Sequence, residues 1–309
     1  MTDAVLSQDD LKTCELCNTT SVAVLHVSRR TGQRVGRCRS CRLVTVLDQL
    51  PHHSIRDLYN STEGYRIYVE AQRVEGLRRR HQATIRRVKE LVPRPLSEAT
   101  IFDVGAGAGE FLALARTAGF DVQGNEISEP AARECFRRHG ITLSTTELGD
   151  EAGENRFDAM TMWCVLAHVA DPRQLLADAL RLLRPDGVLY FHTPRWCMID
   201  VAGLAATRLS SGMLSQITER RVNAAHMRLY DQRNLRHLLH TVGFEIVDIR
   251  SVSGYSLQAA SYLQSMGLPG AVVRPLAVGF EGLIDNDLFV RNTLDVYARK
   301  PARARLRGR

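Results

Sequence analysis

The segment IFDVGAGAGEF, residues 101–111, most constrains how this chain can fold. A short apolar run ends at Asp103. Glycines then occupy every second position, at Gly105, Gly107 and Gly109, before a helical pattern begins. Glycine lets a strand turn abruptly into a helix and lets a bound molecule press against the backbone amides at the helix start. The segment therefore predicts a strand, a tight turn and a helix around a binding site.

The spacing of these glycines bears on what binds there. A dinucleotide fingerprint reads G-x-G-x-x-G, with glycine or alanine in the last place, whereas this segment reads G-A-G-A-G-E. The spacing argues against a pyrophosphate and hence against a dinucleotide-dependent oxidoreductase. Asp103 supports the same conclusion, because a carboxylate repels phosphate and would hold a cation or an ammonium group.

Strand-like and helix-like patterns alternate from residue 100 onward. Strand patterns recur at TIFDV, FDVQGNE, FDAMTMW and GVLYFHT, with a weaker one near ITLS at residues 141–144. This alternation predicts a parallel sheet covered by helices on both faces. Asp231 and Gly243 delimit a further helix, and the runs FEIVDIRSV and TLDVYARK supply the last two strands.

The chain divides into three parts by pattern. Residues 1–50 carry four cysteines and short β-type runs, and residues 51–99 form a helical lid or linker with a helical pattern over 66–92. Residues 100–309 hold the alternating pattern, with an insertion near 195–230 that we expect to bind the substrate.

Four cysteines form two C-x2-C pairs, Cys14 with Cys17 and Cys38 with Cys41. Two such pairs, twenty residues apart, have the spacing of a zinc site with four thiolate ligands. A redox pair would need only one C-x2-C, and disulfides are rare in cytoplasmic chains. We expect the zinc to be structural, because four protein ligands leave no open position for catalysis. The other cysteines are expected to be core or pocket thiols: Cys135, Cys164 and Cys197.

Glu126 follows the second predicted strand in the segment VQGNEIS. A carboxylate at that sheet edge, beside the glycine loop, is suited to accept hydrogen bonds from both hydroxyls of a ribose. By itself Glu126 could equally be a surface acid. Its place after a glycine loop and a second strand favours ribose binding.

The formal net charge is +7, and lysine occurs only at Lys12, Lys89 and Lys300, so the basic residues are almost all arginine. Arginine suits anionic partners, and the basic runs at residues 78–80 and 300–309 could contact RNA. A solvated helix face and a frayed terminus explain these runs equally well. A nucleic-acid partner is therefore a secondary expectation.

Apolar runs in this sequence are short. No segment has the roughly 18 uninterrupted apolar residues that a membrane helix requires. The first ten residues, MTDAVLSQDD, have neither the basic start nor the apolar core of a signal peptide. We expect a cytoplasmic protein without a membrane span.

Four segments, taken as an ordered set, resemble the class I S-adenosylmethionine-dependent methyltransferases: IFDVGAGAGEF, VQGNEIS, FDAMTMWCVLAHVADPRQLLADALRLLRPDGVLYFHTP and HMRLYDQRNLRHLLHTVGFE. The resemblance spans residues 100–250. It implies an α/β, Rossmann-like fold with a seven-stranded, mostly parallel sheet and helices on both faces. It also implies S-adenosylmethionine as the cofactor.

The resemblance assigns roles to particular residues. It implies that Gly105 and Gly107 line the methionine part of the cofactor, that Glu126 holds the ribose and that Ile127 packs on the adenine. It places two further residues toward the cofactor after the fourth strand: Trp163 and Cys164. Asp103 and Gly109, in the same glycine loop, complete the expected cofactor site.

The cysteine pairs followed by LYNSTEGY resemble a bacterial subgroup with a zinc-ribbon head, found in sugar, polysaccharide and natural-product pathways and including the mycofactocin oligosaccharide methyltransferase type. In that subgroup Tyr59 and Tyr65 would be lid residues near the cofactor. The chain departs from it at Ala167-His168, where glutamate usually precedes histidine, so any role of that glutamate is absent here. We expect His168 to pack or to begin a helix rather than to act as a base.

The resemblance implies transfer of the sulfonium methyl group to a hydroxyl of a sugar, an oligosaccharide or a natural product. Two alternatives stay open: an rRNA or tRNA methyltransferase, and a cofactor-binding interaction protein without catalytic activity. Residues 11–50 lack the interleaved aromatic side chains that stack on bases, which argues against RNA.

Methyl transfer to a hydroxyl needs a base, and two histidines are candidates. We rank His226, in NAAHMRLYD, first because it belongs to the insertion, and His192, in FHTP, second. Both should lie at the carboxyl edge of the sheet, where ligands bind in open α/β folds. The structural alternatives are a helix-start residue for His226 and a buried hydrogen-bonded residue for His192.

Overall fold

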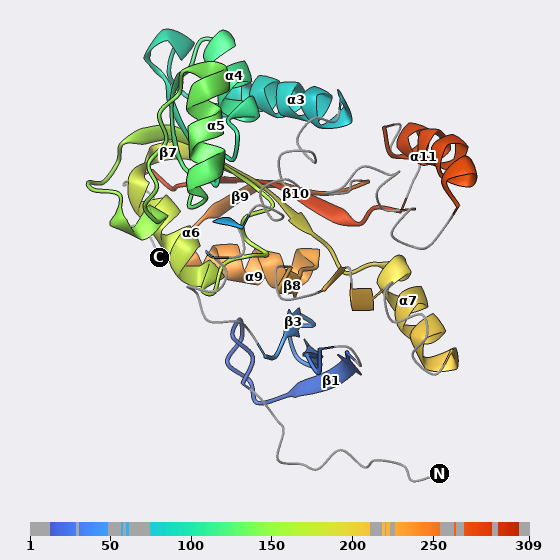
Figure 1. Ribbon diagram of the computed structural model, residues 1–309. Coiled ribbons are helices and arrows are strands. Elements are labelled where there is room, and N and C mark those ends of the chain that lie inside the picture. Colours follow the sequence, from blue (N-terminus) through green and yellow to red (C-terminus); the bar gives the residue numbers. More distant parts are fainter. Residues whose placement is uncertain are drawn as a thin grey trace.

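The computed structural model describes most of the chain and organises it around two sheets. The described residues are 13–28, 31–48, 57, 60, 61, 75–210, 218, 219, 221, 222, 226–253, 263, 269–285 and 290–302. A six-stranded sheet has the order β5-β4-β6-β7-β10-β9, and a four-stranded sheet has the order β1-β2-β3-β8. Figure 1 shows the first three strands of the small sheet, in blue, below the large sheet.

The large sheet is mostly parallel. Its strands are β4 (Thr100–Val104), β5 (Asp121–Asn125), β6 (Phe157–Trp163), β7 (Leu183–Pro194), β9 (Glu245–Val252) and β10 (Thr293–Arg299). The strands β5, β4, β6 and β7 run parallel, and β10 runs antiparallel to both of its neighbours. This confirms the predicted α/β fold with a mostly parallel sheet.

The sheet has six strands in the described part of the chain rather than seven. The weak strand expected near residues 141–144 is reduced to one parallel bridge between Asn125 and Ser144. Local side-chain bonds compete with a longer ladder there. The Asn125 side chain donates to the carbonyl of Thr146 at 2.9 Å, and the Thr146 amide donates to the Ser144 hydroxyl at 3.3 Å.

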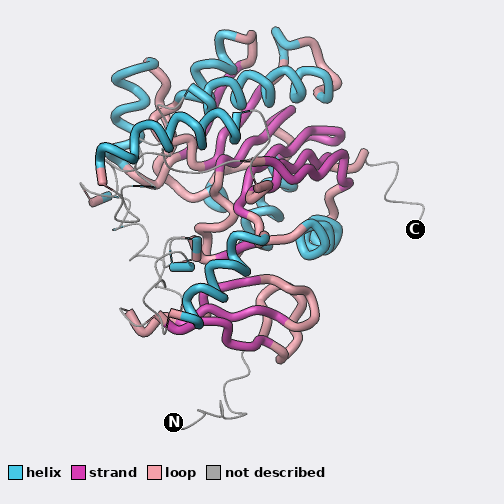
Figure 2. Tube along the Cα trace, turned by 90° about the vertical axis from the view of Figure 1, so that its right-hand side faces the viewer, coloured by secondary structure: helices cyan, strands magenta, loops and turns pink. Residues whose placement is uncertain are grey.

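Helices cover both faces of the large sheet (Figures 1 and 2). The α-helices are α3 (Glu75–Leu91), α4 (Glu110–Thr117), α5 (Glu129–His139), α6 (Pro172–Leu182), α7 (Met198–Leu209), α9 (Gln232–Val242) and α11 (Gly270–Asp285). The described residues also form the short 3-10 helices η2 (Leu96–Glu98) and η3 (Leu148–Asp150). Helices α3, α4 and α5 lie on one face, and α6 and α9 lie on the other. Within the described residues no helix has both the length and the apolar character to cross a lipid bilayer.

Alternate residues of the central strands pack into two different apolar layers. Ile101 and Val188 belong to the layer that contains residues of α3 and α4, whereas Phe102 and Leu189 belong to the layer that contains residues of α6 and α9. Strands buried on both faces read as nearly continuous apolar runs, which is why β4 and β7 stand out in the sequence.

The cysteine-bearing segment forms the small sheet. Its strands β1 (Val22–Val27), β2 (Arg34–Cys38) and β3 (Val44–Val46) are antiparallel, and β3 pairs with β8 (Arg228–Leu229) from far along the chain. Leu16 and Leu43 belong to the same apolar layer as residues of α6 and α9. The small sheet is therefore joined to the rest of the molecule by strand pairing and by a shared core.

Candidate active site

The glycine loop between β4 and α4 turns through left-handed backbone at Gly105 (φ 65°), Gly107 (φ 58°) and Gly109 (φ 82°). Residues with a Cβ rarely adopt this conformation. A Cβ on Gly109 would lie 2.2 Å from the sulfur of Cys135, and one on Gly105 would lie 2.9 Å from Cγ2 of Val165. Gly105 and Gly109 therefore make room for neighbouring side chains, and their contact with a cofactor stays a prediction.

Glu126 follows β5 and fastens the glycine loop. Its Oε2 accepts a hydrogen bond from the Gly107 amide at 2.8 Å, and its Oε1 accepts one from the Ser128 amide at 2.8 Å. The residue is 6% exposed, and burial raises the pKa of its carboxyl, an effect that the amide donors oppose. Each carboxylate oxygen has a second lone pair, so Glu126 can hold the loop and also accept ribose hydroxyls. The adjacent Ile127 is half-buried.

Asp103 lies one residue before the end of β4, in a buried polar position. It is 1% exposed, and its Oδ1 accepts a hydrogen bond from the Thr161 hydroxyl at 2.6 Å. Burial raises its pKa to about 8, the Thr161 bond opposes this shift, and the charge of Glu126 adds to it. A carboxyl with this pKa is mostly protonated at pH 7 and ionises when a cation comes near. This environment suits the cation or ammonium group that we expect at Asp103.

Trp163, at the end of β6, lies in an aromatic cluster. Its ring centroid is 4.3 Å from that of His81, 5.4 Å from that of Phe111 and 4.9 Å from that of Tyr190. Burial lowers the pKa of His81 to about 3, so this ring is neutral and packs as an aromatic group. The half-buried Trp163 gives the carboxyl edge of the sheet an apolar wall. Sequence reasoning missed His81, which carries no motif.

His192, on β7, forms a pair with Asp295, which lies opposite it on β10. The His192 Nδ1 is 2.7 Å from the Asp295 Oδ1, which also accepts a hydrogen bond from the Tyr190 hydroxyl at 3.2 Å. Burial lowers the pKa of His192, and the Asp295 carboxylate opposes this shift. Nη1 of Arg80 lies 3.4 and 3.5 Å from the two ring nitrogens of His192.

This pairing resembles the way that base histidines are oriented in enzymes. The carboxylate fixes the proton on Nδ1 and leaves Nε2 as the basic nitrogen. Sequence reasoning missed Asp295 and Arg80. The available signal for Asp295 was an acid inside the strand-like run TLDVYARK, but its partner depends on the strand register.

His226 lies beside Cys164 and His168. The Cys164 sulfur is 3.6 Å from Nε2 of His226 and 3.7 Å from Nε2 of His168, and the centroids of the two imidazoles are 4.4 Å apart. Burial lowers the pKa of His226 to about 4, with a further contribution from the charge of Arg221. Burial also raises the pKa of Cys164 to about 12. The structure thus brings together three residues for which the sequence suggested separate roles.

The four cysteines of the small sheet converge. The Cys14 and Cys41 sulfurs are 3.5 Å apart, those of Cys17 and Cys38 are 3.6 Å apart, and all four lie within 4.8 Å of one another. A disulfide needs about 2.05 Å between sulfurs, and all seven cysteines of the chain are free of disulfides. Zinc–sulfur bonds of about 2.3 Å place the thiolates of a tetrahedral site about 3.8 Å apart. The separations therefore fit the predicted zinc site.

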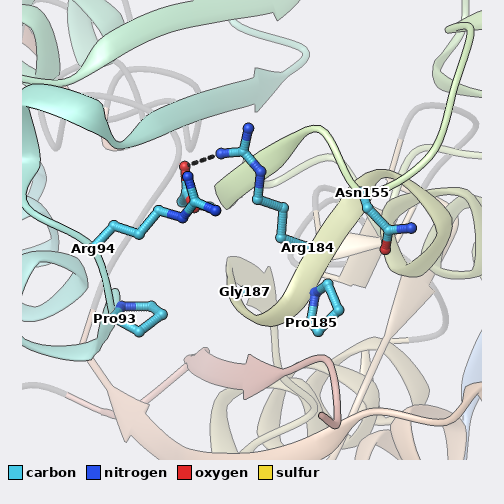
Figure 3. Close-up of a pocket in the computed structure, with 7 residues that line it drawn as sticks. Pro93, Arg94, Asn155, Arg184, Pro185 and Gly187 are labelled. Atoms are coloured by element: carbon cyan, nitrogen blue, oxygen red, sulfur yellow. Dashed lines mark hydrogen bonds and ion pairs between the residues drawn. The ribbon is translucent and has the colours of Figure 1, made fainter. Parts of the chain in front are cut away.

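A surface pocket of about 400 Å³ lies at the opposite, amino end of the parallel strands (Figure 3). Arg94 and Arg184 line it and both form ion pairs with the buried Asp158, to which Arg184 Nη1 approaches within 2.5 Å. One carboxylate thus pairs with both arginines of the pocket. The predicted lid residues Tyr59 and Tyr65 lie outside the described residues.

Comparison with known proteins identifies the family of this chain. Residues 77–249, more than half of its length, match the family described as methyltransferase domain. The chain belongs to this family. The matched range begins after β1, β2 and β3 of the small sheet and includes β8, the fourth strand of that sheet.

Curated relatives of this methyltransferase domain share part of its length. The chain is 34% identical to a ubiquinone biosynthesis O-methyltransferase of Methylococcus capsulatus over 98 residues, which are 29% of this chain and 41% of the relative. It is 28% identical over 188 residues to an uncharacterized 37.1 kDa transposon protein of Streptomyces fradiae, covering 58% of this chain and 52% of the relative. The chain thus spans about half or less of the curated relatives it matches.

Solved structures share the fold of this methyltransferase domain. Magnesium protoporphyrin IX methyltransferase from Synechocystis, with bound SAH, has a TM-score of 0.55 at 14% identity and covers 81% of this chain and 100% of its own. Phosphoethanolamine N-methyltransferase 2 of Haemonchus contortus, in complex with S-adenosyl-L-methionine, has a TM-score of 0.56 at 16% identity. The match covers 80% of this chain and 60% of that chain.

Proposed function

We propose that the chain transfers the methyl group of S-adenosylmethionine to a hydroxyl oxygen, with a sugar, an oligosaccharide or a natural product as the acceptor. The observation that carries the proposal is the strand register. Val104 pairs with Met162, and Met162 pairs with Phe191, in adjacent parallel strands. Gly105, Trp163 and His192 directly follow Val104, Met162 and Phe191 along the chain. The glycine loop, the aromatic wall and the candidate base therefore lie at the same level of the sheet edge.

The cofactor side of this site is built from buried acids and glycines. Glu126 would hold the ribose hydroxyls while it ties down Gly107, and Asp103 would face the positively charged methionine part. Ile127 and Trp163 would pack against the adenine and the rest of the cofactor. The bound cofactor supplies a methyl carbon activated by its positive sulfonium.

His192 is the base that the contacts favour. In the proposed step the acceptor oxygen forms a bond to the methyl carbon as the carbon–sulfur bond breaks, and the hydroxyl proton passes to Nε2 of His192. Asp295 would stabilise the imidazolium that results, because it already faces Nδ1 at 2.7 Å. His226 stays the alternative base, although its pKa of about 4 makes it a weak one near neutral pH.

The relatives support an oxygen acceptor, since several are ubiquinone biosynthesis O-methyltransferases. We further propose that Cys14, Cys17, Cys38 and Cys41 hold a structural zinc, whose four thiolates would leave it no open position. A zinc-ribbon head of this kind supports the resemblance to the subgroup of sugar and natural-product pathways.

Labelled S-adenosylmethionine tests the proposed function. The purified chain is incubated with it and with separate pools of glycosides and oligosaccharides, phenols, and RNA. We expect label in a hydroxyl-bearing small molecule or glycan, and no label with Glu126→Ala at a low cofactor concentration. Labelled RNA with unlabelled glycans and phenols would replace the acceptor class by RNA. Binding of NADH without binding of S-adenosylhomocysteine would overturn the whole assignment.

A further inference from the structure

We propose that Cys164, His168 and His226 form a second metal centre, which binds one divalent transition metal of the zinc type and leaves one coordination position open. The ligand atoms of the three residues all lie within 4.8 Å of one another. They are separate from the four cysteines of the small sheet, which form the other such group in the described part of the chain.

The distances fit a tetrahedral ion. Zinc binds a thiolate sulfur at about 2.3 Å and an imidazole nitrogen at about 2.0 to 2.1 Å, which places sulfur and nitrogen about 3.6 Å apart at the tetrahedral angle. The Cys164 sulfur lies 3.6 Å from Nε2 of His226 and 3.7 Å from Nε2 of His168. Both sulfur–nitrogen distances therefore match those expected around one shared ion.

The backbone is arranged to bring these ligands together. Cys164 has a left-handed conformation with φ of 63°, which is unfavourable for a residue with a Cβ, and its amide donates to the carbonyl of His192 at 2.9 Å. The Met227 amide donates to the carbonyl of Ala167 at 2.9 Å. This bond joins the residues directly beside His168 and His226, so two distant segments present their imidazoles to one sulfur.

The positive charge near the three proposed ligands is balanced by a carboxylate. Arg221 is the charged group that acts on both Cys164 and His226. Its guanidinium forms an ion pair with the buried Asp200, whose Oδ1 lies 2.8 Å from Nε. The positive charge near the cluster is therefore paired with a carboxylate.

The ligand set differs in kind from that of the small sheet. One thiolate and two imidazoles suit zinc and related ions, and three protein ligands leave a fourth position, as in catalytic rather than structural zinc sites. Val165, next to Cys164, packs on Gly105 of the glycine loop. The open position would take water or, if the proposed methyl transfer is right, the hydroxyl oxygen of the acceptor.

Counting metal ions tests the proposal, because a thiol hydrogen-bonded to two imidazoles would show the same distances without a metal. The full chain is purified with excess zinc, freed of loose metal by gel filtration and measured by elemental mass spectrometry. We expect two ions per chain in the wild type and in Cys197→Ser, a matched thiol control at the start of α7. We expect one ion in Cys164→Ala and in His226→Ala.

Cobalt gives a second measurement on the same proteins. The spectrum of cobalt-loaded wild type minus that of cobalt-loaded His226→Ala should show the absorption of a site with one thiolate, because the four-thiolate site is present in both proteins and cancels. A wild type with one ion per chain, or variants that keep two, would overturn the metal centre. The count does not depend on catalysis, so two ions without methyl transfer would refute the proposed function alone, and methyl transfer with one ion would refute the metal centre alone.

Discussion

Arg228 is completely buried and donates hydrogen bonds to both carboxylate oxygens of Glu15, each at 2.6 Å. Glu15 stands between the first two cysteines of the chain. The same guanidinium donates to the carbonyls of Val169 and Ala170, which directly follow His168. One pair of residues thus connects the cysteine-bearing turn to the segment that lines the candidate active site.

Breaking this pair should destabilise the protein. Glu15→Ala leaves the Arg228 charge buried without its carboxylate, a change that typically costs about 3 to 5 kcal/mol. Because the Glu15 side chain is 28% exposed, we expect the lower end of this range. Urea unfolding of the zinc-loaded chain measures the loss. Glu98→Ala, at an exposed carboxylate, is the control, and equal losses in the two variants would contradict the assigned role of the pair.

Loss of one thiolate should release the metal of the small sheet. Cys38→Ser leaves three thiolates around the ion, and loss of the ion removes the link between the two cysteine-bearing turns. We expect elemental analysis to show one zinc ion fewer per chain than in wild type, and proteolysis to begin within residues 13–48. Protein purified without chelators that contains no zinc at all would refute the site.

The features that the sequence predicted well depend on local chemistry. The turns at Gly105 and Gly109 need left-handed backbone, which glycine alone adopts readily. The glycines in the sequence therefore indicate the loop directly. Helix α9 begins and ends as expected because Asp231 accepts a hydrogen bond from the Asn234 amide and Gly243 ends the helix in a left-handed conformation.

The features that the sequence did not reveal depend on contacts between distant segments. Asp295 meets His192 only because β10 pairs with β7 in one particular antiparallel register. His226 reaches Cys164 only because the Met227 amide bonds to a carbonyl in the loop after β6. Neither relation leaves a periodic or spacing signal in the chain.

Removal of the Glu126 carboxylate should weaken cofactor binding. Glu126→Ala loses the acceptors proposed for the ribose and frees the Gly107 amide, and the loss of charged hydrogen bonds typically costs about 1.5 to 3 kcal/mol. Calorimetry with S-adenosylhomocysteine measures the change. Glu129→Ala removes an exposed carboxylate three residues away and should bind as wild type does. Wild-type affinity in Glu126→Ala would contradict the ribose assignment.

Cofactor binding should depend on pH through Asp103. Its pKa is 3.8 for the ordinary side chain and about 8 in the fold, so the empty protein holds a proton there at pH 7. A cationic ligand favours the ionised form. We therefore expect S-adenosylmethionine binding to release a proton and to tighten as the pH rises from 6 to 8. Calorimetry in two buffers of different ionisation enthalpy detects that proton.

The same carboxyl should affect the stability of the empty protein. A raised pKa means that its stabilising contribution is complete below about pH 4 and is lost as the pH rises through about 8. Asp103→Asn removes this loss, so the variant should melt at a higher temperature than wild type at pH 8 to 9 and should bind the cofactor without pH dependence. A variant that is less stable than wild type at pH 9 would contradict the buried-acid assignment.

The base can be identified from the pH profile of the rate. His192 must be neutral to accept a proton, and burial lowers its pKa below the ordinary 6.5, so kcat should stay high until the pH falls below 6.5. His192→Ala should lower kcat by about 10² to 10⁴, the usual effect of losing a general base, with little change in cofactor affinity. His240→Ala, at an exposed histidine of α9, is the control.

Asp295→Asn separates orientation from proton transfer. Asp295 raises the pKa of His192 and fixes its ring, so the variant should lose rate while the acid limb of the profile moves to lower pH. If His226 were the base instead, the acid limb of the wild type would lie near pH 4, where burial places the pKa of His226. His192→Ala would then keep most of the wild-type rate at neutral pH, and that result would assign the proton transfer to His226.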